Sequence, residues 1–457
     1  MSTIACISPI DGSVFAERPV MPVDDARKAV EAARAAQKAW AARPLADRAD
    51  LVMAGVEALG AMNDEVVVEL AHMMGRPTRY GGEFGGVRER ATWMAQNAAA
   101  ALAPQIVEDS DAFERRLTRE PVGVVFVIAP WNYPYLTAIN TIGAALIAGN
   151  TVVLKHASQT LLAGERMVRA FVQAGVPADV FQNLFLDHAT TEALIGEKLF
   201  GFVNFTGSVN GGRAIERAAA GTFTAVGLEL GGKDPGYVME DADPIIAAAG
   251  LIDGAMFNSG QCCCGIERIY VVEQHYDAFV AEALKIVRAY RLGNPMDPAT
   301  DIGPMAHKRF AAEARAQVAE AVAAGAIAHI ETDPADDGGT YMTPQILTNV
   351  DHSMRVMRDE TFGPVVGIMK VSGDAEAIAL MNDCQFGLTA SLWTNDAARA
   401  AAVGAEIETG TVFMNRCDYL DPALCWTGCK DTGRGAALSA FGFHAVTRPK
   451  SWHLKKA

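Results

Sequence analysis

The sequence predicts an α/β fold built around a doubly wound parallel sheet. Residues 122–129 are almost entirely apolar and rich in β-branched side chains, which is typical of a strand buried on both faces. A helical pattern follows over residues 135–147, and strand character returns at residues 151–155. Further strands are predicted at residues 180–186, 201–205 and 222–230. Strands that alternate with helices in this way pair in parallel, and ligands bind beyond their carboxyl ends.

The segment before this sheet is mainly helical. Pro9 and the pair Asp11-Gly12 predict a short hairpin over residues 8–15. Amphipathic helices are predicted over residues 24–40, 47–62 and 64–74, with Asp24 or Asp25 as the N-cap of the first. Alternating side chains between residues 103 and 121 indicate an extended ribbon instead of a helix.

Composition and charge favour an enzyme that acts on small molecules. The chain has 457 residues, 50% of them hydrophobic and 20% charged, and this length favours two or three domains. Its formal net charge is −15. Nucleic acids and anionic membranes bind basic surfaces, so we expect neither as a partner.

We expect the protein to be cytoplasmic. The first residues lack the basic start and the long apolar run of a signal peptide. No apolar stretch reaches the roughly 18 residues that span a bilayer. The eight cysteines are few for this length and clustered, which favours reduced thiols over a disulfide framework.

Three adjacent cysteines, Cys262, Cys263 and Cys264, follow a glycine turn at Gly260. Such residues are often small buried hydrophobic side chains. A zinc site is a less favoured alternative, because zinc ligands come in spaced pairs and no histidine is close. The third interpretation is a nucleophile, since part of a thiol is already thiolate at neutral pH, with the upstream Glu229 as its base.

Six short segments in a fixed order favour the nucleophile. They are PWNYP at residues 130–134, LKHA at 154–157, NFTGS at 204–208, LELGGK at 228–233, GQCC at 260–263 and ETFGP at 360–364. In content, order and spacing this set resembles the aldehyde dehydrogenase superfamily, and in particular its NAD(P)-dependent, hydrolytic semialdehyde dehydrogenases. The resemblance spans most of the chain.

This resemblance implies three parts. A Rossmann-like cofactor-binding domain is expected at residues 1–102 and 122–230, with residues 432–444 returning to it. An α/β catalytic domain is expected at residues 231–431. Residues 103–121 and 445–457 are expected to form a small β oligomerisation arm, so that the protein would be a homodimer or a homotetramer.

The resemblance also implies a covalent mechanism. The Gly-Gln-x-Cys match selects Cys263 as the nucleophile that attacks a small-molecule aldehyde. Asn132 and the Cys263 backbone N–H would stabilise the oxyanion, and hydride transfer to the nicotinamide would leave a thioester. Glu229 would then activate the water that hydrolyses this thioester to a carboxylic acid. Its neighbours Leu228 and Leu230 are expected to desolvate the carboxylate and raise its pKa.

The expected cofactor is NADP or NAD. The G-x-G-x-x-G fingerprint is absent, and in its place a glycine turn precedes a helix predicted over residues 213–220, whose first N–H groups can meet a phosphate. Ser158 stands where many NAD-preferring relatives have a ribose-binding Glu. Without that charge the 2′-phosphate of NADP is acceptable. The expected cofactor contacts are Trp131, Lys155, Ser158, Gly207, Ser208, Gly212, Leu230, Glu360 and Phe362, with no metal.

The aldehyde pocket is expected between the helix after Asn132 and the cysteine segment. Arg416 is a candidate for binding a distal carboxylate through a bidentate contact, which would make the substrate a dicarboxylic semialdehyde. The alternative is a solvated loop arginine. The expected pocket residues are Tyr133, Thr137, Asn140, Met256, Cys262, Cys264 and Arg416.

Two other functions stay open at this point. A coenzyme A-acylating aldehyde dehydrogenase would transfer the acyl group from the thioester, although the presence of Glu229 speaks against it. A non-catalytic binding or structural protein on the same fold is a hypothesis of another class. The residues Asn132, Glu229, Cys263 and Glu360 speak against this hypothesis.

Overall fold

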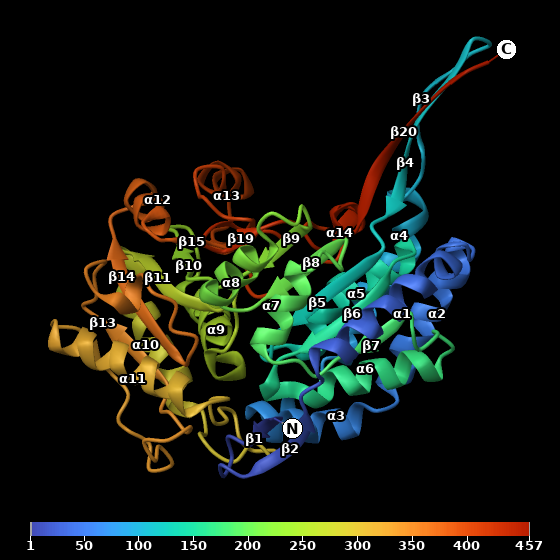
Figure 1. The fold of residues 1–457 in the computed structure, drawn as a ribbon. Coiled ribbons are helices and arrows are strands. Elements are labelled where there is room, and N and C mark those ends of the chain that lie inside the picture. Colours follow the sequence, from blue (N-terminus) through green and yellow to red (C-terminus); the bar gives the residue numbers. More distant parts are fainter. Residues whose placement is uncertain (1, 457) are drawn as a thin grey trace.

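Two mostly parallel sheets form the body of the protein in the computed structural model, which describes residues 2–456 (Figure 1). The first sheet has the strand order β19-β9-β8-β5-β6-β7. Its parallel strands run in both directions outward from β5, so the sheet is doubly wound and has a switch point between β5 and β8. The strands are β5 (Val124–Ala129), β6 (Thr151–His156), β7 (Phe181–Asn183), β8 (Phe202–Thr206), β9 (Ala225–Glu229) and the antiparallel edge β19 (Gly433–Arg434).

Alternate side chains of β5 enter two different cores. Val125 and Val127 pack with the helices of one face, whereas Phe126 belongs to the core on the other face. Both faces are therefore covered, as the apolar run predicted. The first face carries α2 (Leu45–Gly60), α3 (Asn63–Met74), α4 (Phe84–Ala101), α5 (Pro134–Ala148) and α6 (Leu161–Gln173), and the second carries α1 (Val23–Ala41), α7 (His188–Gly196) and α8 (Val209–Ala219).

The second sheet has the order β12-β13-β14-β11-β10-β16-β17. Its strands are β10 (Asp234–Val238), β11 (Ile266–Val272), β13 (Gln345–Thr348), β14 (Val365–Val371), β16 (Thr389–Trp393), β17 (Thr411–Met414) and the antiparallel edge β12 (Ile327–Ala328). One face packs on α9 (Pro244–Met256) and α10 (Glu273–Ala289), and the other on α11 (Lys308–Ala323), α12 (Asp374–Asn382) and α13 (Ala397–Gly404). Residues 231–431 thus hold a complete second α/β unit; its boundaries stay a prediction.

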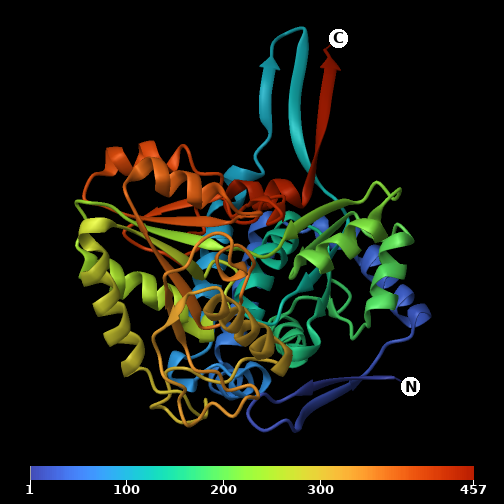
Figure 2. The ribbon, with the colours of Figure 1, turned by 90° about the vertical axis from the view of Figure 1, so that its left-hand side faces the viewer.

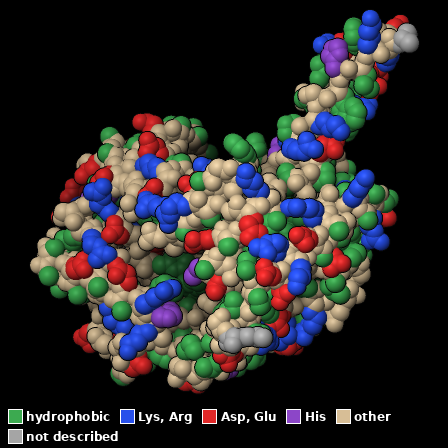
Figure 3. All heavy atoms as spheres, viewed as in Figure 1, with side chains coloured by type: hydrophobic (Ala, Val, Ile, Leu, Met, Phe, Trp, Pro, Cys, Tyr) green, Lys and Arg blue, Asp and Glu red, His purple; other side chains and the backbone are tan. Residues whose placement is uncertain are grey.

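A three-stranded ribbon projects from this body (Figures 1 and 2). It consists of β3 (Gln105–Asp109), β4 (Phe113–Pro121) and the C-terminal β20 (Thr447–Lys455), which follows α14 (Ser439–Ala445). The pairing of β20 with β4 is antiparallel from Thr447 opposite Pro121 to Lys455 opposite Phe113. Acidic and basic side chains are interspersed over the face shown in Figure 3. None of the described helices combines the length and the apolar character that crossing a membrane requires.

Most element boundaries lie close to those predicted, with three differences. The N-cap of α1 is Pro22, and Asp24 and Asp25 occupy the first turn, where their charges favour the helix dipole. The expectation of an aspartate cap is therefore wrong. Helix α8 begins at Val209, earlier than expected, because the Ser208 side chain caps it by accepting from the Gly211 N–H at 3.2 Å. Near the N-terminus, β1 (Thr3–Ile7) and β2 (Val14–Pro19) form a hairpin that is longer than expected, and most of the predicted segment 8–15 is the turn between them.

Candidate active site

A left-handed turn positions the three cysteines. After α9, the residues Asn258, Ser259 and Gly260 have φ values of 54°, 58° and 69°. A Cβ on Gly260 would lie 2.1 Å from the carbonyl oxygen of Gly363, so only glycine fits there. The turn is fixed by Gln261, whose Nε2 donates to the Asn258 carbonyl at 3.1 Å while its Oε1 accepts from the Ala306 N–H at 2.8 Å. The cysteine segment is therefore held rigidly.

The three thiols are close but differ in environment. Their sulfur atoms lie within 4.8 Å of one another. Cys262 and Cys264 are buried and donate to Asp418 Oδ1 at 3.3 and 3.0 Å, whereas Cys263 is partly exposed. The neighbouring thiols of Cys262 and Cys264 lower the pKa of Cys263 against the effect of burial, and the pKa values of these two neighbours are raised. The thiolate is therefore best stabilised on Cys263.

Asn132 lies against the cysteine turn. It follows β5, is 6% exposed, and its Nδ2 donates to the Gln261 carbonyl at 3.2 Å. The backbone carbonyl of Asn132 accepts from Arg76 Nη2 at 2.6 Å and from Asn258 Nδ2 at 3.4 Å. The amide thus keeps one N–H free next to the segment that carries Cys263.

Arg76 and Glu83 hold Asn132 and the cysteine turn in place. They form an ion pair of 2.7 Å, with side chains 4% and 3% exposed. Arg76 Nε donates to Asn258 Oδ1 at 3.1 Å, while Glu83 accepts from the N–H groups of Tyr135 at 2.9 Å and Leu136 at 2.6 Å. The sequence reasoning missed both residues, because the active-site segments that they contact are distant along the chain.

Glu229 ends β9 and lines the same cavity as Cys263. Burial raises the pKa of its carboxyl to about 7, against the opposing effects of a Thr206 hydroxyl at 3.4 Å and the charge of Arg90. A carboxylate with such a pKa can take a proton near neutral pH. Burial therefore gives Glu229 the protonation behaviour of a general base.

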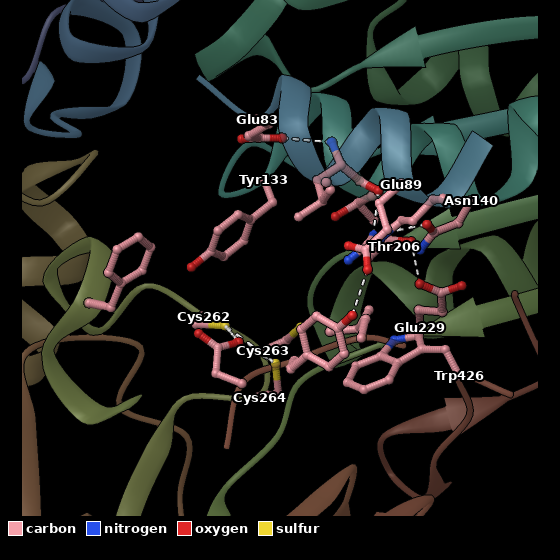
Figure 4. Close-up of a pocket in the computed structure, with 18 of the residues that line it drawn as sticks. Glu83, Glu89, Tyr133, Asn140, Thr206, Glu229, Cys262, Cys263, Cys264 and Trp426 are labelled. Atoms are coloured by element: carbon pink, nitrogen blue, oxygen red, sulfur yellow. Dashed lines mark hydrogen bonds between the residues drawn. The ribbon is translucent and has the colours of Figure 1, made fainter. Parts of the chain in front are cut away.

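The cavity has a volume of about 370 Å³ and lies between α4, α5 and the cysteine segment (Figure 4). In Figure 4, Tyr133 points toward the cysteines, and Asn140 and Glu229 extend from other elements. Of the expected pocket residues, the lining includes Tyr133, Thr137, Asn140, Cys262 and Cys264. The lining residues that sequence reasoning missed include Arg76, Arg90, Leu136, Leu388 and Trp426.

Two expected pocket residues lie elsewhere. Met256 is 1% exposed and packs in the core of the second sheet, because the last turn of α9 directs it there. Arg416 is exposed, and its guanidinium stacks over the Tyr419 ring at 3.9 Å, outside the cavity lining. The structure thus corrects both pocket assignments.

The residues expected to contact the cofactor gather where the strands of the first sheet end. Lys155 is the penultimate residue of β6 and is 9% exposed. Within residues 2–456 its Nζ makes a single hydrogen bond, to the His156 carbonyl at 3.4 Å, so its other hydrogens are available to hydroxyl groups. Burial lowers its pKa to about 8. Ser158, which is exposed, follows β6 closely. These donors fit the ribose of a dinucleotide.

The glycine turn before α8 fits a phosphate. Ser208 caps the helix, and a Cβ on Gly207 would lie 2.8 Å from the Phe205 ring. A Cβ on Gly212 would meet Leu230 at 2.7 Å, so α8 packs tightly on the end of the sheet. The N–H groups of the first turn then point beyond the carboxyl end of β8.

Glu360 and Phe362 reach this region from the second sheet. Glu360 accepts from the Gly232 N–H at 3.0 Å, and burial raises the pKa of its carboxyl to about 8. Phe362 has φ 51° and lies edge-on to Trp131, with ring centroids 5.5 Å apart. Glu267 fixes this loop by accepting from the Phe362 N–H at 2.9 Å.

The family profile described as the aldehyde dehydrogenase family matches residues 1–452. The chain belongs to the aldehyde dehydrogenase family. An aldehyde dehydrogenase of Paenarthrobacter nicotinovorans is 33% identical, over 98% of this chain and 99% of the relative. A succinate-semialdehyde dehydrogenase [NADP(+)] of Mycolicibacterium paratuberculosis is 32% identical, over 98% of this chain and 96% of the relative.

A solved NAD-dependent aldehyde dehydrogenase from Sinorhizobium meliloti has a TM-score of 0.94 to this structure. It is 32% identical, covering 100% of this chain and 92% of its own. These findings confirm the expected fold class and activity. The protein is an NAD(P)-dependent aldehyde dehydrogenase that oxidises an aldehyde with NAD or NADP.

Alkylation tests the assignment of the thiolate in this dehydrogenase. We expect the rate of iodoacetamide labelling at Cys263 to rise with pH at a midpoint below about 8.5, the value of a free thiol. Cys262→Ala should raise this midpoint, because it removes a neighbouring thiol that lowers the pKa of Cys263. The measurement is labelling rate against pH with mass-spectrometric site assignment. Cys429→Ala, which alters a thiol outside the cavity, is the control, and an unshifted midpoint in Cys262→Ala would contradict the assignment.

Proposed function

We propose that this dehydrogenase oxidises its aldehyde hydrolytically, through a covalent adduct on Cys263. The observation that carries this proposal is a single cavity lined by both Cys263, with its lowered pKa, and Glu229, with its raised pKa. The Cys263 thiolate adds to the carbonyl carbon and forms a thiohemiacetal. Asn132 Nδ2 and the Cys263 N–H donate to the resulting oxyanion.

Bound NAD(P) supplies the acceptor for the hydride that leaves the adduct carbon. Lys155, Ser208 and Glu360 would hold the cofactor. Loss of the hydride leaves a thioester on Cys263, and Glu229 takes a proton from the water that attacks it. The carbon–sulfur bond then breaks, which releases the carboxylic acid and regenerates the thiol. Glu229 favours this hydrolysis over acyl transfer to coenzyme A, which does not require a base for water.

Glu229→Gln should separate the two half-reactions. We expect a burst of one NAD(P)H per subunit to remain while the steady-state rate falls about 100- to 10,000-fold, because no base activates the water. In the unmodified enzyme the steady-state rate should fall as the pH drops below about 7, since Glu229 becomes protonated. Stopped-flow absorbance of the reduced nicotinamide measures both. A steady state that the unmodified enzyme reaches only when coenzyme A is added would instead support acyl transfer.

The cofactor proposal is that NADP is accepted because position 158 carries no charge. Ser158 is exposed and follows closely after β6, the strand that carries Lys155. The M. paratuberculosis relative is named for NADP(+), which supports the proposal. A glutamate at this position would repel a 2′-phosphate.

Ser158→Glu should therefore shift the preference toward NAD. We expect kcat/KM for NADP to fall about 10- to 100-fold relative to NAD, the effect of one like-charge contact near the surface. Initial rates with both cofactors measure the ratio, and Ser158→Gln is the uncharged control of the same size. Negligible turnover of the unmodified enzyme with saturating NADP would refute the proposal.

The substrate proposal is an aldehyde with a distal carboxylate. Support comes from the M. paratuberculosis relative, which is named a succinate-semialdehyde dehydrogenase. The small cavity, of about 370 Å³, suits a short chain. Arg416 does not line this cavity, so another group must contact the carboxylate.

We further propose that the projecting ribbon joins subunits into a homo-oligomer. Ile106 and Val107 of β3 are 58% and 56% exposed, an unusual density of apolar surface on a strand with one free edge. A second subunit would cover them.

The eight cysteines, all free in the structure, support the proposed cytoplasmic location.

Charges on the ribbon should weaken the assembly. The double substitution Ile106→Lys and Val107→Lys would bury two ammonium groups in the contact, and we expect a smaller particle mass because that burial is unfavourable. Light scattering coupled to size exclusion measures the mass. Val322→Lys, on an exposed position of α11, is the control. An unchanged mass in the double variant would place the contact elsewhere.

A further inference from the structure

Arg90 is a buried cation without a carboxylate partner. It lies on α4, is 5% exposed and lines the catalytic cavity. Its Nη1 donates to two neutral acceptors, the Leu136 carbonyl at 2.6 Å and Asn140 Oδ1 at 2.9 Å, and it forms no ion pair within residues 2–456. A guanidinium stays charged in a protein, and a buried charge is costly unless an anion approaches it.

Asn140 adds an unused donor at the same place. The residue is 1% exposed, and its Nδ2 is buried without a hydrogen-bond partner. Because Oδ1 accepts from Arg90, the orientation of the amide is determined, and Nδ2 is the amide atom left without a partner. The hydroxyl of Tyr133, another lining residue, is also buried and unpartnered. The cavity wall therefore carries unmet donors beside a cation.

The acidic groups near Arg90 leave its charge largely uncompensated. Glu83 is paired with Arg76 at 2.7 Å, and burial keeps the pKa of Asp418 well above its usual range, which disfavours the charged form of this carboxyl. Burial also raises the pKa of Glu229 to about 7. Glu89 is exposed and accepts from the Tyr419 hydroxyl at 2.6 Å.

We propose that Arg90 and Asn140 form the subsite that binds the distal carboxylate of the substrate. The N–H groups of the Arg90 guanidinium that are not engaged by Leu136 and Asn140 donate to one carboxylate oxygen. Asn140 Nδ2 donates to the carboxylate as well. This subsite determines specificity and takes no part in bond making. The inference rests on the proposed function, and it deepens that function by naming the residues that recognise the substrate.

The test compares two four-carbon aldehydes, succinic semialdehyde and butanal, which differ in the carboxylate. For Arg90→Met we expect the ratio of kcat/KM values, semialdehyde over butanal, to fall about 10- to 150-fold, the effect of one charged hydrogen-bond contact. Arg88→Met is the matched control on the same helix, because the Arg88 side chain is 59% exposed and forms an ion pair with Glu57 at the surface. Arg90→Lys should recover part of the ratio.

Asn140→Asp tests the second half of the subsite. It keeps the oxygen that accepts from Arg90 but replaces the unused donor with a carboxylate, so it should neutralise the guanidinium and lower the same ratio. Thermal unfolding checks that each variant is folded. Competitive inhibition by succinate gives an independent reading, and its inhibition constant should rise with the ratio change.

Two outcomes would overturn the inference. An equal loss with both aldehydes, together with a shifted pH midpoint, would mean that Arg90 acts through Glu229 as a positioning residue. An unchanged ratio in folded Arg90→Met would mean that another group binds the distal carboxylate of the substrate. If unmodified enzyme turned over neither aldehyde without coenzyme A, the proposed function would fail instead, while succinate binding would still report on the subsite.

Discussion

The buried ion pair of Arg76 and Glu83 is the interaction on which the active-site geometry depends. It joins the segment after α3, the start of α4, the first turn of α5 and the cysteine turn. Such a pair adds little net stability compared with apolar side chains, but losing one partner costs about 3–5 kcal/mol because the other charge stays buried. Its contribution is therefore positional. It fixes the Asn132 carbonyl and Asn258 relative to each other, and so sets where the oxyanion donor meets the nucleophile.

A single physical cause, the exclusion of water, adjusts the protonation of several groups in different directions. Burial raises the pKa of Glu229 to about 7 and that of Glu360 to about 8, and it lowers that of Lys155 to about 8. Burial disfavours every charged form, so carboxyls and amines shift oppositely. Cys263 departs from this trend because the flanking thiols of Cys262 and Cys264 lower its pKa. The three adjacent cysteines thus favour the thiolate on one sulfur.

The sequence predicted the strands of the first sheet well because buried parallel strands are continuous apolar runs. The assignment of Cys263, Glu229 and Asn132 to one site came from the family motifs; in the structure Cys263 and Glu229 line one cavity, and Asn132 contacts the cysteine turn. Sequence reasoning failed for Arg416 and Met256, because spacing along the chain does not determine the direction of a loop side chain. Arg90 carried a signal that was not used: it shares the helical face of Val87, Met94 and Ala98, so a buried arginine was predictable. The pairing of Arg76 with Glu83 depends on tertiary packing, which sequence periodicity does not report.

The edge of β9, the strand that carries Glu229, pairs with a segment near the C-terminal end of the chain. Gly433 pairs with Glu229, and Arg434 with Leu228, so β19 covers the outer edge of β9. During synthesis, β9 therefore emerges from the ribosome long before its partner, with its row of N–H and C=O groups unpaired. An open edge of this kind is prone to pair with other chains. Premature termination upstream of Gly433 thus leaves a nearly complete protein with a permanently open edge at its catalytic base, a product suited to aggregation and degradation.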